Sequence, residues 1–117
     1  AYADGYVIPV PEKNLAAYRT MSRKAGKLWK EHGALEYKEC VSEDLNTQWG
    51  AGFAKQIKLK PGEVIVFAWI LFKSRAHRDR VNAKVMKDPR LEKPDPKKVP
   101  FEPKRMLYGG FKVFVDM

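Results

Sequence analysis

The segment Val64–Phe72 contains nine consecutive apolar residues, and it constrains the fold more than any other part of the chain. Its β-branched and aromatic residues and its length, far short of a membrane span, predict a β-strand. Successive side chains of a strand point to opposite faces of the sheet. Both faces of this strand therefore need burial, as in a strand with a layer on each side.

The flanking patterns predict three further strands and two helices. Asn14 and Ser74 are suited to begin the helices as N-caps, and Gly33 and Asp88-Pro89 to end them. Gly109-Gly110 predicts a β-bulge in the last strand. The predicted strands are Asp4–Val10, Ala34–Val41, Glu63–Phe72 and Arg105–Val115, and the predicted helices span about 14–32 and 74–87. The long connection Ser42–Gly62 is expected to hold a short helix or strand around Phe53–Leu59, and the proline-rich segment Arg90–Pro103 to be an extended loop.

The element order β-α-β-β-α-β predicts an α+β fold, the ferredoxin-like plait. Right-handed crossovers then give a four-stranded antiparallel sheet with both helices on one face. Residues 1–117 are expected to form one domain of ordinary size. The helices cover only one face of the Val64–Phe72 strand, and the second face would expose a large apolar patch. We therefore expect a homodimer in which this second face packs against another copy.

The composition predicts a compact cytoplasmic protein. Hydrophobic residues make up 44% of the chain and charged residues 32%, as in globular domains. The single cysteine, Cys40, can form no internal disulfide and cannot complete a thiolate zinc site, which fits a reducing cytosol. The start of the chain, Ala1–Asp4, has no basic and apolar leader, and no apolar run could span a bilayer. Neither secretion nor membrane insertion is expected.

The net charge of +9 favours an acidic partner. Arg19, Arg23, Lys27 and Lys30 form one face of the first predicted helix, and no acidic residue falls between Lys13 and Lys30 to pair with them. This face is either a solvated surface or the docking surface of a non-enzymatic module that binds an acidic protein or RNA. RNA on the sheet is not expected, because the third strand lacks the charge and glycine of an RNA-recognition signature.

Three segments carry a family resemblance: WKEHGALEY at Trp29–Tyr37, SRAHRDRVNAKVM at Ser74–Met86 and KRMLYGGF at Lys104–Phe111. They are similar to the YbaA-like proteins, small bacterial proteins of unknown function in the dimeric α/β-barrel superfamily. The resemblance covers nearly the whole chain. It implies the fold and the dimer of that superfamily, and it implies neither an activity nor a cofactor.

His77 and Trp69 are the candidate catalytic residues. His77 shares a helical stripe with Val81 and Val85, where it is either a half-buried structural histidine or a general base at the mouth of a cavity. Some dimeric α/β-barrel monooxygenases that degrade haem use a tryptophan, a histidine and an asparagine, and the pair of Trp69 and His77 resembles that set. The first strand departs from this pattern, because it has Tyr6–Ile8 where the asparagine would lie.

Arg75 and Arg78, at the start of the second predicted helix, are candidate ligand-binding residues. Cations there oppose the helix dipole, so they indicate either a bound anion or ion pairs with nearby carboxylates. Arg105 and Tyr108 complete the candidate set. The sequence thus favours a pocket between sheet and helices for a small anionic or aromatic ligand, with cofactor-free oxidative or isomerase-like chemistry as the reaction it would support. Whether the protein is an enzyme stays open.

Overall fold

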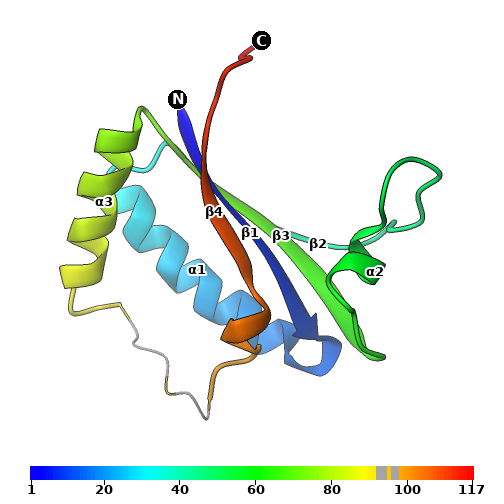
Figure 1. Ribbon diagram of the computed structural model, residues 1–117. Coiled ribbons are helices and arrows are strands. Elements are labelled where there is room, and N and C mark those ends of the chain that lie inside the picture. The colour runs from blue at the N-terminus through cyan, green and yellow to red at the C-terminus, as the bar shows by residue number, and fades with distance from the viewer. Residues whose placement is uncertain (92–94, 96–97) are drawn as a thin grey trace.

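The computed structural model describes residues 1–91, 95 and 98–117, and it shows a four-stranded sheet with two long helices on one side (Figure 1). The strands are β1 (Tyr2–Pro11), β2 (Glu36–Val41), β3 (Glu63–Phe72) and β4 (Leu107–Lys112). The helices are α1 (Leu15–Glu31), α2 (Phe53–Gln56) and α3 (Arg75–Lys87), with 3-10 turns at Glu12–Asn14 and Pro103–Arg105. Within the predicted loop Arg90–Pro103, residues 92–94 and 96–97 lie outside the described part of the chain.

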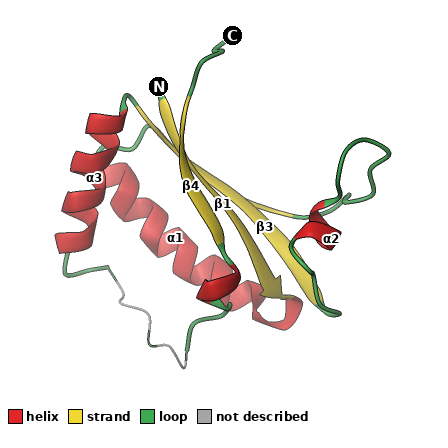
Figure 2. Cartoon of the chain, viewed as in Figure 1, coloured by secondary structure: helices red, strands yellow, loops and turns green. Residues whose placement is uncertain are grey.

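The strand order is β2-β3-β1-β4, and all three strand pairs are antiparallel. Figure 2 shows α1 and α3 side by side on one side of the sheet, and α2 on the other side near one end. This arrangement confirms the ferredoxin-like plait predicted from the element order. The most apolar strand, β3, pairs with β1 on one side and with β2 on the other, so it lies inside the sheet. We call the sheet surface under α1 and α3 the covered face and the opposite surface the open face.

The predicted caps differ in how they work. Ser74 caps α3 as expected, since its Oγ accepts a hydrogen bond from the His77 N–H at 3.1 Å. Asn14 precedes α1, but its side chain donates to the carbonyl of Pro100 at 3.1 Å instead of accepting from the helix. Gly33 follows α1 with a φ of 116°, a conformation that glycine tolerates best.

The predicted bulge in β4 is wrong. Gly109 and Gly110 pair with Gly5 and Asp4 in unbroken register. These glycines provide space: a Cβ atom on Gly110 would collide with the hydroxyl of Tyr2. The strand is also shorter than predicted, because it begins at Leu107 and ends at Lys112.

Two clusters of buried side chains form the core on the covered face. One lies under α3 and the end of α1 and contains Leu28, Ala34, Ile70, Phe72, Val81 and Val85. The other lies under the start of α1 and contains Ile8, Val10, Tyr18, Val66 and Ala68. Tyr6 packs against both clusters. The two ends of the core therefore meet at Tyr6 in the middle of β1.

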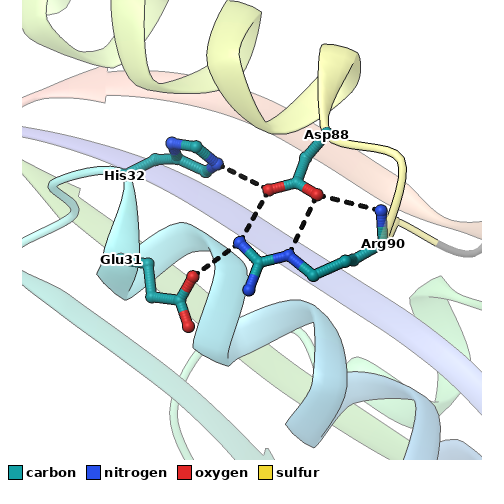
Figure 3. Close-up of polar contacts among 4 residues, drawn as sticks. All are labelled: Glu31, His32, Asp88 and Arg90. Carbon is teal, nitrogen blue, oxygen red and sulfur yellow. Dashed lines mark hydrogen bonds and ion pairs between the residues drawn. The ribbon is translucent and has the colours of Figure 1, made fainter.

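A charged cluster joins the C-terminal ends of α1 and α3 (Figure 3). The carboxylate of Asp88 lies 2.9 Å from His32 Nε2 and accepts hydrogen bonds from the Arg90 Nε and Nη2 groups at 3.1 and 2.9 Å. Arg90 also bonds Glu31 at 2.7 Å. The bonds from Arg90 and His32 hold the pKa of Asp88 well below its ordinary value. The cluster holds the two helices together above the covered face.

The open face is apolar and largely uncovered. Phe67 of β3 is 45% exposed, and Leu107 and Phe111 of β4 are 58% and 62% exposed. Trp69 lies beside Phe67, with ring centroids 5.8 Å apart, and its indole N–H donates to Glu36 at 2.9 Å. The chain thus buries the covered face of β3 and covers its open face only in part, with Ile65 buried, Trp69 and Leu71 half-buried and Phe67 exposed. No helix within the described ranges is long and apolar enough to cross a bilayer.

Candidate functional site

A cavity of about 220 Å³ lies between α1 and the covered face. Ala25 of α1 and Ala68 of β3 both line it, and such small side chains leave space between a helix and a sheet. Its wall is mainly aromatic and apolar, and the aromatic members are Tyr6, Tyr18, Trp29, Tyr37, Trp69 and Phe101. Phe101 comes from the segment before β4 and packs edge-on against Tyr18 at 5.8 Å. Helix, sheet and this segment therefore all contribute to the cavity.

Glu39 places a carboxylate in the apolar wall. Each of its oxygens accepts one hydrogen bond from a phenol: the Tyr18 hydroxyl lies 2.7 Å from Oε1, and the Tyr37 hydroxyl lies 2.7 Å from Oε2. Hydrogen bonds to an ionised carboxylate are among the stronger ones in proteins. Two such bonds stabilise a negative charge at a position where an unpaired carboxylate would be costly.

The phenols around Glu39 stay protonated. Burial, followed by the neighbouring charge and hydrogen bond of Glu39, raises the pKa of Tyr18 and of Tyr37 above the ordinary value. Burial also raises the pKa of Tyr6, whose ring packs on Tyr108 at 4.9 Å. The Tyr6 hydroxyl forms no hydrogen bond with any residue that the structure describes. Tyr6 therefore has a free donor and acceptor in the wall of the cavity.

A second carboxylate, which is fully buried, lies next to the cavity. Asp4 of β1 is fully buried, and its Oδ1 lies 3.3 Å from Arg78 Nη1. The Asn82 amide donates to Asp4 Oδ2 at 3.5 Å and accepts the indole N–H of Trp29 at 2.9 Å. Because Trp29 also lines the cavity, this network connects the wall of the cavity to α3.

The charge of Arg78 is already matched inside the protein. Its guanidinium forms ion pairs with Asp4 and, at 2.9 Å, with Asp79, donates to the Tyr2 hydroxyl at 3.2 Å and lies over the Tyr2 ring at 4.9 Å. Burial raises the pKa of Asp4 more than Arg78 lowers it. Burial also opposes the charge of Arg78, but Asp4, Tyr2 and Asp79 outweigh it, so the pKa of Arg78 is raised. An anion here would compete with two carboxylates.

The structure places the predicted catalytic residues on different faces. His77 lies at the start of α3, where its ring packs edge-on against Phe72 at 6.0 Å and its Nδ1 accepts the N–H of Lys73 at 3.0 Å. Burial and the nearby cations lower the pKa of His77, so it is neutral. Trp69 borders the cavity along β3, but its ring lies beside Phe67 on the open face. His77 and Trp69 do not meet.

The predicted ligand-binding residues separate into three places. Arg78 and Tyr108 come together, with the Tyr108 hydroxyl 3.5 Å from Arg78 Nη1. Arg105 forms a two-pronged ion pair with Glu63, which lowers the pKa of Glu63. Arg75 is exposed at the first residue of α3. Only the pair formed by Arg78 and Tyr108 adjoins the cavity, through the contact of Tyr108 with Tyr6.

Sequence reasoning missed the two carboxylates of the covered face, the buried Asp4 and the half-buried Glu39, although the alternation of the strands contains a signal for both. Glu39 is two residues from Tyr37, so it shares the face that Tyr37 uses, and Asp4 is two residues from Tyr6. A charged residue at a position that alternation assigns to the core must be paired there. The partners come from α1 and α3, however, and their identity follows only from the packing.

The fold and the cavity define a class: a single α+β plait whose helices enclose an aromatic cavity with a phenol-bound carboxylate. The chain belongs to the family described as "Protein of unknown function (DUF1428)", whose model matches residues 1–103. It is 42% identical over 115 residues to the uncharacterized protein YbaA of Escherichia coli K12, covering 98% of this chain and 97% of the relative. The uncharacterized YbaA of Shigella flexneri matches to the same extent. The resemblance to the YbaA-like proteins is confirmed.

Among solved structures, an uncharacterized NIPSNAP domain protein from Burkholderia xenovorans has a similar fold, with a TM-score of 0.56 over the full length of both chains. The two sequences are 10% identical. This likeness supports the fold class alone. The chemistry of the cavity has to be argued from the residues of this chain.

Proposed function

We propose that the protein is a homodimeric small-molecule-binding domain, and that its ligand occupies the cavity between α1 and the covered face. The observation that carries this proposal is the Glu39 carboxylate, held by two phenols in a wall that is otherwise mostly apolar. Binding sites for small molecules combine apolar walls with a few placed polar groups in this way. A merely structural carboxylate gains nothing from a cavity beside it.

The size of the cavity limits the ligand. Drug-sized ligands occupy pockets of roughly 300–1,000 Å³, whereas a cavity of about 150 Å³ holds benzene. The volume of about 220 Å³ therefore fits a molecule built on one aromatic ring with a short substituent. The rings of Trp29 and Phe101 provide the apolar contact.

The charge of the site limits the ligand further. Glu39 is an acceptor, and the carboxylate of an anionic ligand beside it would be repelled. Lys38 also borders the cavity, but it is exposed, so solvent screens its attraction for an anion. A ligand with an ammonium, amide or hydroxyl donor would complete the hydrogen bonding of Glu39 and of the free Tyr6 hydroxyl. Of the two ligand classes that the sequence favours, the aromatic one thus has the better support and the anionic one the weaker support.

The same groups are suited to proton transfer. Glu39 can accept a proton from a bound molecule, and the protonated phenols of Tyr18 and Tyr37 can donate hydrogen bonds to the charge that develops. Among the reactions that the sequence favours, isomerase-like chemistry would therefore use Glu39 as its base. The predicted base, His77, donates and accepts its hydrogen bonds elsewhere.

The homodimer would form through the open face. Phe67, Leu107 and Phe111 are exposed there, and the register places Val7 of β1 between Phe67 and Leu107. Two copies that each carry a net charge of +9 repel one another. The centre of the open face is uncharged, so a second copy can pack on it, through a two-fold contact, without bringing cations together.

The ligand proposal is tested by measuring binding of benzylamine, benzyl alcohol and benzoate by calorimetry and by thermal shift. We expect benzylamine and benzyl alcohol to bind and benzoate to bind at least about tenfold more weakly, which corresponds to about 1.4 kcal/mol. Tyr6→Phe removes only the free hydroxyl and should weaken benzyl alcohol. Glu39→Gln should remove most of the preference for benzylamine.

Tyr108→Phe is the matched control, because it removes the same group from the ring that stacks on Tyr6 but lies outside the cavity. This variant should bind all three compounds with affinities within about twofold of those of the native protein. If benzoate binds best and Tyr108→Phe weakens it, the ligand site is at Arg78 and the Glu39 assignment is wrong. If none of the three compounds binds the native protein, the cavity is not a site for single-ring ligands.

A further inference from the structure

We propose that the outer edge of β2, together with the basic face of α1, binds an extended acidic segment of another protein by strand addition. The surface is a groove of about 650 Å³ between α1 and β2, and it contains the cations Arg19, Arg23, Lys27 and Lys30. The groove shares Tyr37 and Glu39 with the wall of the cavity, but its four cations lie outside the cavity, so this inference does not require the cavity to bind a ligand.

The cations of the groove lack internal counter-charges. Within the described part of the chain, Arg19, Arg23 and Lys27 form no ion pair, and Lys30 donates to the backbone carbonyl of Leu35 at 2.8 Å. The two carboxylates of the groove are already used: Glu31 bonds Arg90, and Glu39 accepts from two phenols. The groove therefore presents positive charge to solvent, and its complement is a run of negative charge.

The backbone of β2 is available for strand addition, because β2 lies at the end of the sheet order. The Ser42 N–H donates to the Ile65 carbonyl at 2.8 Å, and antiparallel pairs alternate. The residues that pair with β3 are therefore the even-numbered ones, and the backbone groups of Tyr37, Glu39 and Val41 point outward. An unpaired edge of this kind is a template for another strand.

The geometry specifies the pattern of the partner. Side chains of an added strand alternate between the two faces of the extended sheet. Every second side chain would lie on the side of α1, facing Arg23 and Lys27, and the others would lie on the side of Glu36 and Lys38. The expected segment is extended and has Asp or Glu at every second position. In a segment whose acidic residues are clustered, only half of the acidic side chains would lie on the side of the cations.

A protein segment fits this surface better than RNA does. Single-stranded RNA is held by exposed aromatic side chains on which bases stack. The aromatic residue in the groove is Tyr37, and its hydroxyl and ring are engaged by Glu39 and Trp29. The groove offers charge and backbone hydrogen bonds, which are the two requirements of acidic strand addition.

The test uses a fluorescent peptide of about nine residues that alternates glutamate and threonine, measured by anisotropy against the full chain. We expect binding that weakens as salt rises. Arg23→Glu with Lys27→Glu should weaken it at least about tenfold, whereas Lys84→Glu with Lys87→Glu, the same charge change on exposed positions of α3, should weaken it less than about threefold. A peptide of the same composition with its glutamates clustered should also bind at least about tenfold more weakly.

Backbone methylation separates strand addition from simple charge attraction. Two peptides carry N-methyl groups on alternate residues, one on the odd-numbered and one on the even-numbered residues. The methyl groups leave the charge unchanged, but in one of the two peptides they remove the hydrogen bonds to β2. That peptide should not bind. Equal binding of both methylated peptides overturns the strand-addition model. Tighter binding of oligouridylate than of the alternating peptide at the same salt would make the groove a nucleic-acid site and would also overturn it. Circular dichroism confirms that each variant is folded.

Discussion

Each face of the sheet departs in one respect from the usual distribution of polar and apolar groups. The covered face, which α1 and α3 bury, carries two carboxylates, Asp4 and Glu39, among its apolar residues. The open face, which lies toward solvent, carries the exposed Phe67, Leu107 and Phe111. Soluble domains normally avoid both buried carboxylates and large exposed apolar patches. Each face therefore has a feature that stability of the monomer alone does not require.

The two faces differ in what would complete them. Each carboxylate of the covered face has partners within the chain: Asp4 pairs with Arg78 and accepts from Asn82, and Glu39 accepts from two phenols. Asp4 Oδ1, however, accepts no hydrogen bond from any residue that the structure describes. What this face leaves unfilled is space, in the cavity. The open face has the reverse character, because its residues have no polar requirement and lack only a covering layer. This difference is why we propose a small ligand for one face and a second copy of the chain for the other.

The largest effect is expected where the covered face is broken. Arg78→Ala leaves the Asp4 carboxylate buried without its cation, which should cost roughly 3–5 kcal/mol of unfolding free energy. Urea denaturation measures it. Arg75→Ala, an exposed arginine of the same helix, is the control and should change stability by less than about 0.5 kcal/mol.

A double variant makes the result specific to the ion pair. Asp4→Leu with Arg78→Met replaces both charges by apolar groups and should recover most of the stability lost in Arg78→Ala. If Arg78→Ala alone is as stable as the native protein, Asp4 is not held by Arg78. The assignment of Arg78 as a structural residue would then be wrong, and its guanidinium would again be available for a ligand.

The next effect concerns the open face. Phe67→Asp or Trp69→Asp introduces a charge where the proposed second copy would pack, so at least one of them should convert a dimer to a monomer in analytical ultracentrifugation. Met86→Asp is the control, because Met86 is 59% exposed on α3, outside the open face. If Phe67→Asp and Trp69→Asp both sediment as stable dimers, or if the native protein is a monomer, the open face is not the dimer contact.

Much of the fold could be predicted from local patterns. The strand Glu63–Phe72 agrees with the structure at both ends, because its apolar run is uninterrupted and lies between Gly62 and Lys73-Ser74. The capping of α3 by Ser74 and the stop after Lys87 follow from side-chain chemistry at single positions. The bulge at Gly109-Gly110 was predicted wrongly because glycine has two uses in strands. Here it makes room for the ring of Tyr2, a residue far away in sequence.

The site was much less predictable. Arg78 and Tyr108 do lie together, but the sequence does not show that Asp4 and Asp79 already form ion pairs with Arg78. The link between Glu39 and Tyr18 joins residues 21 positions apart, on different elements. Local periodicity places each residue on a face of its own helix or strand. It cannot say which faces meet, and the cavity is a property of how they meet.

The smallest effect tests how closely α1 fits the covered face at Gly26. In an ordinary helix interior, Gly→Ala stabilises by about 1 kcal/mol. A Cβ atom on Gly26, however, would lie 2.8 Å from the ring of Tyr37, which bonds Glu39 and lines the cavity. Overpacking of this kind costs roughly 1–3 kcal/mol, so Gly26→Ala should be neutral to destabilising by about 2 kcal/mol. In a Tyr37→Ala background the ring is gone, and the same substitution should stabilise by about 1 kcal/mol. A double-mutant cycle by urea denaturation measures the difference. If Gly26→Ala stabilises both backgrounds equally, the contact between α1 and Tyr37 is loose, and Tyr37 does not hold Glu39 in a fixed position.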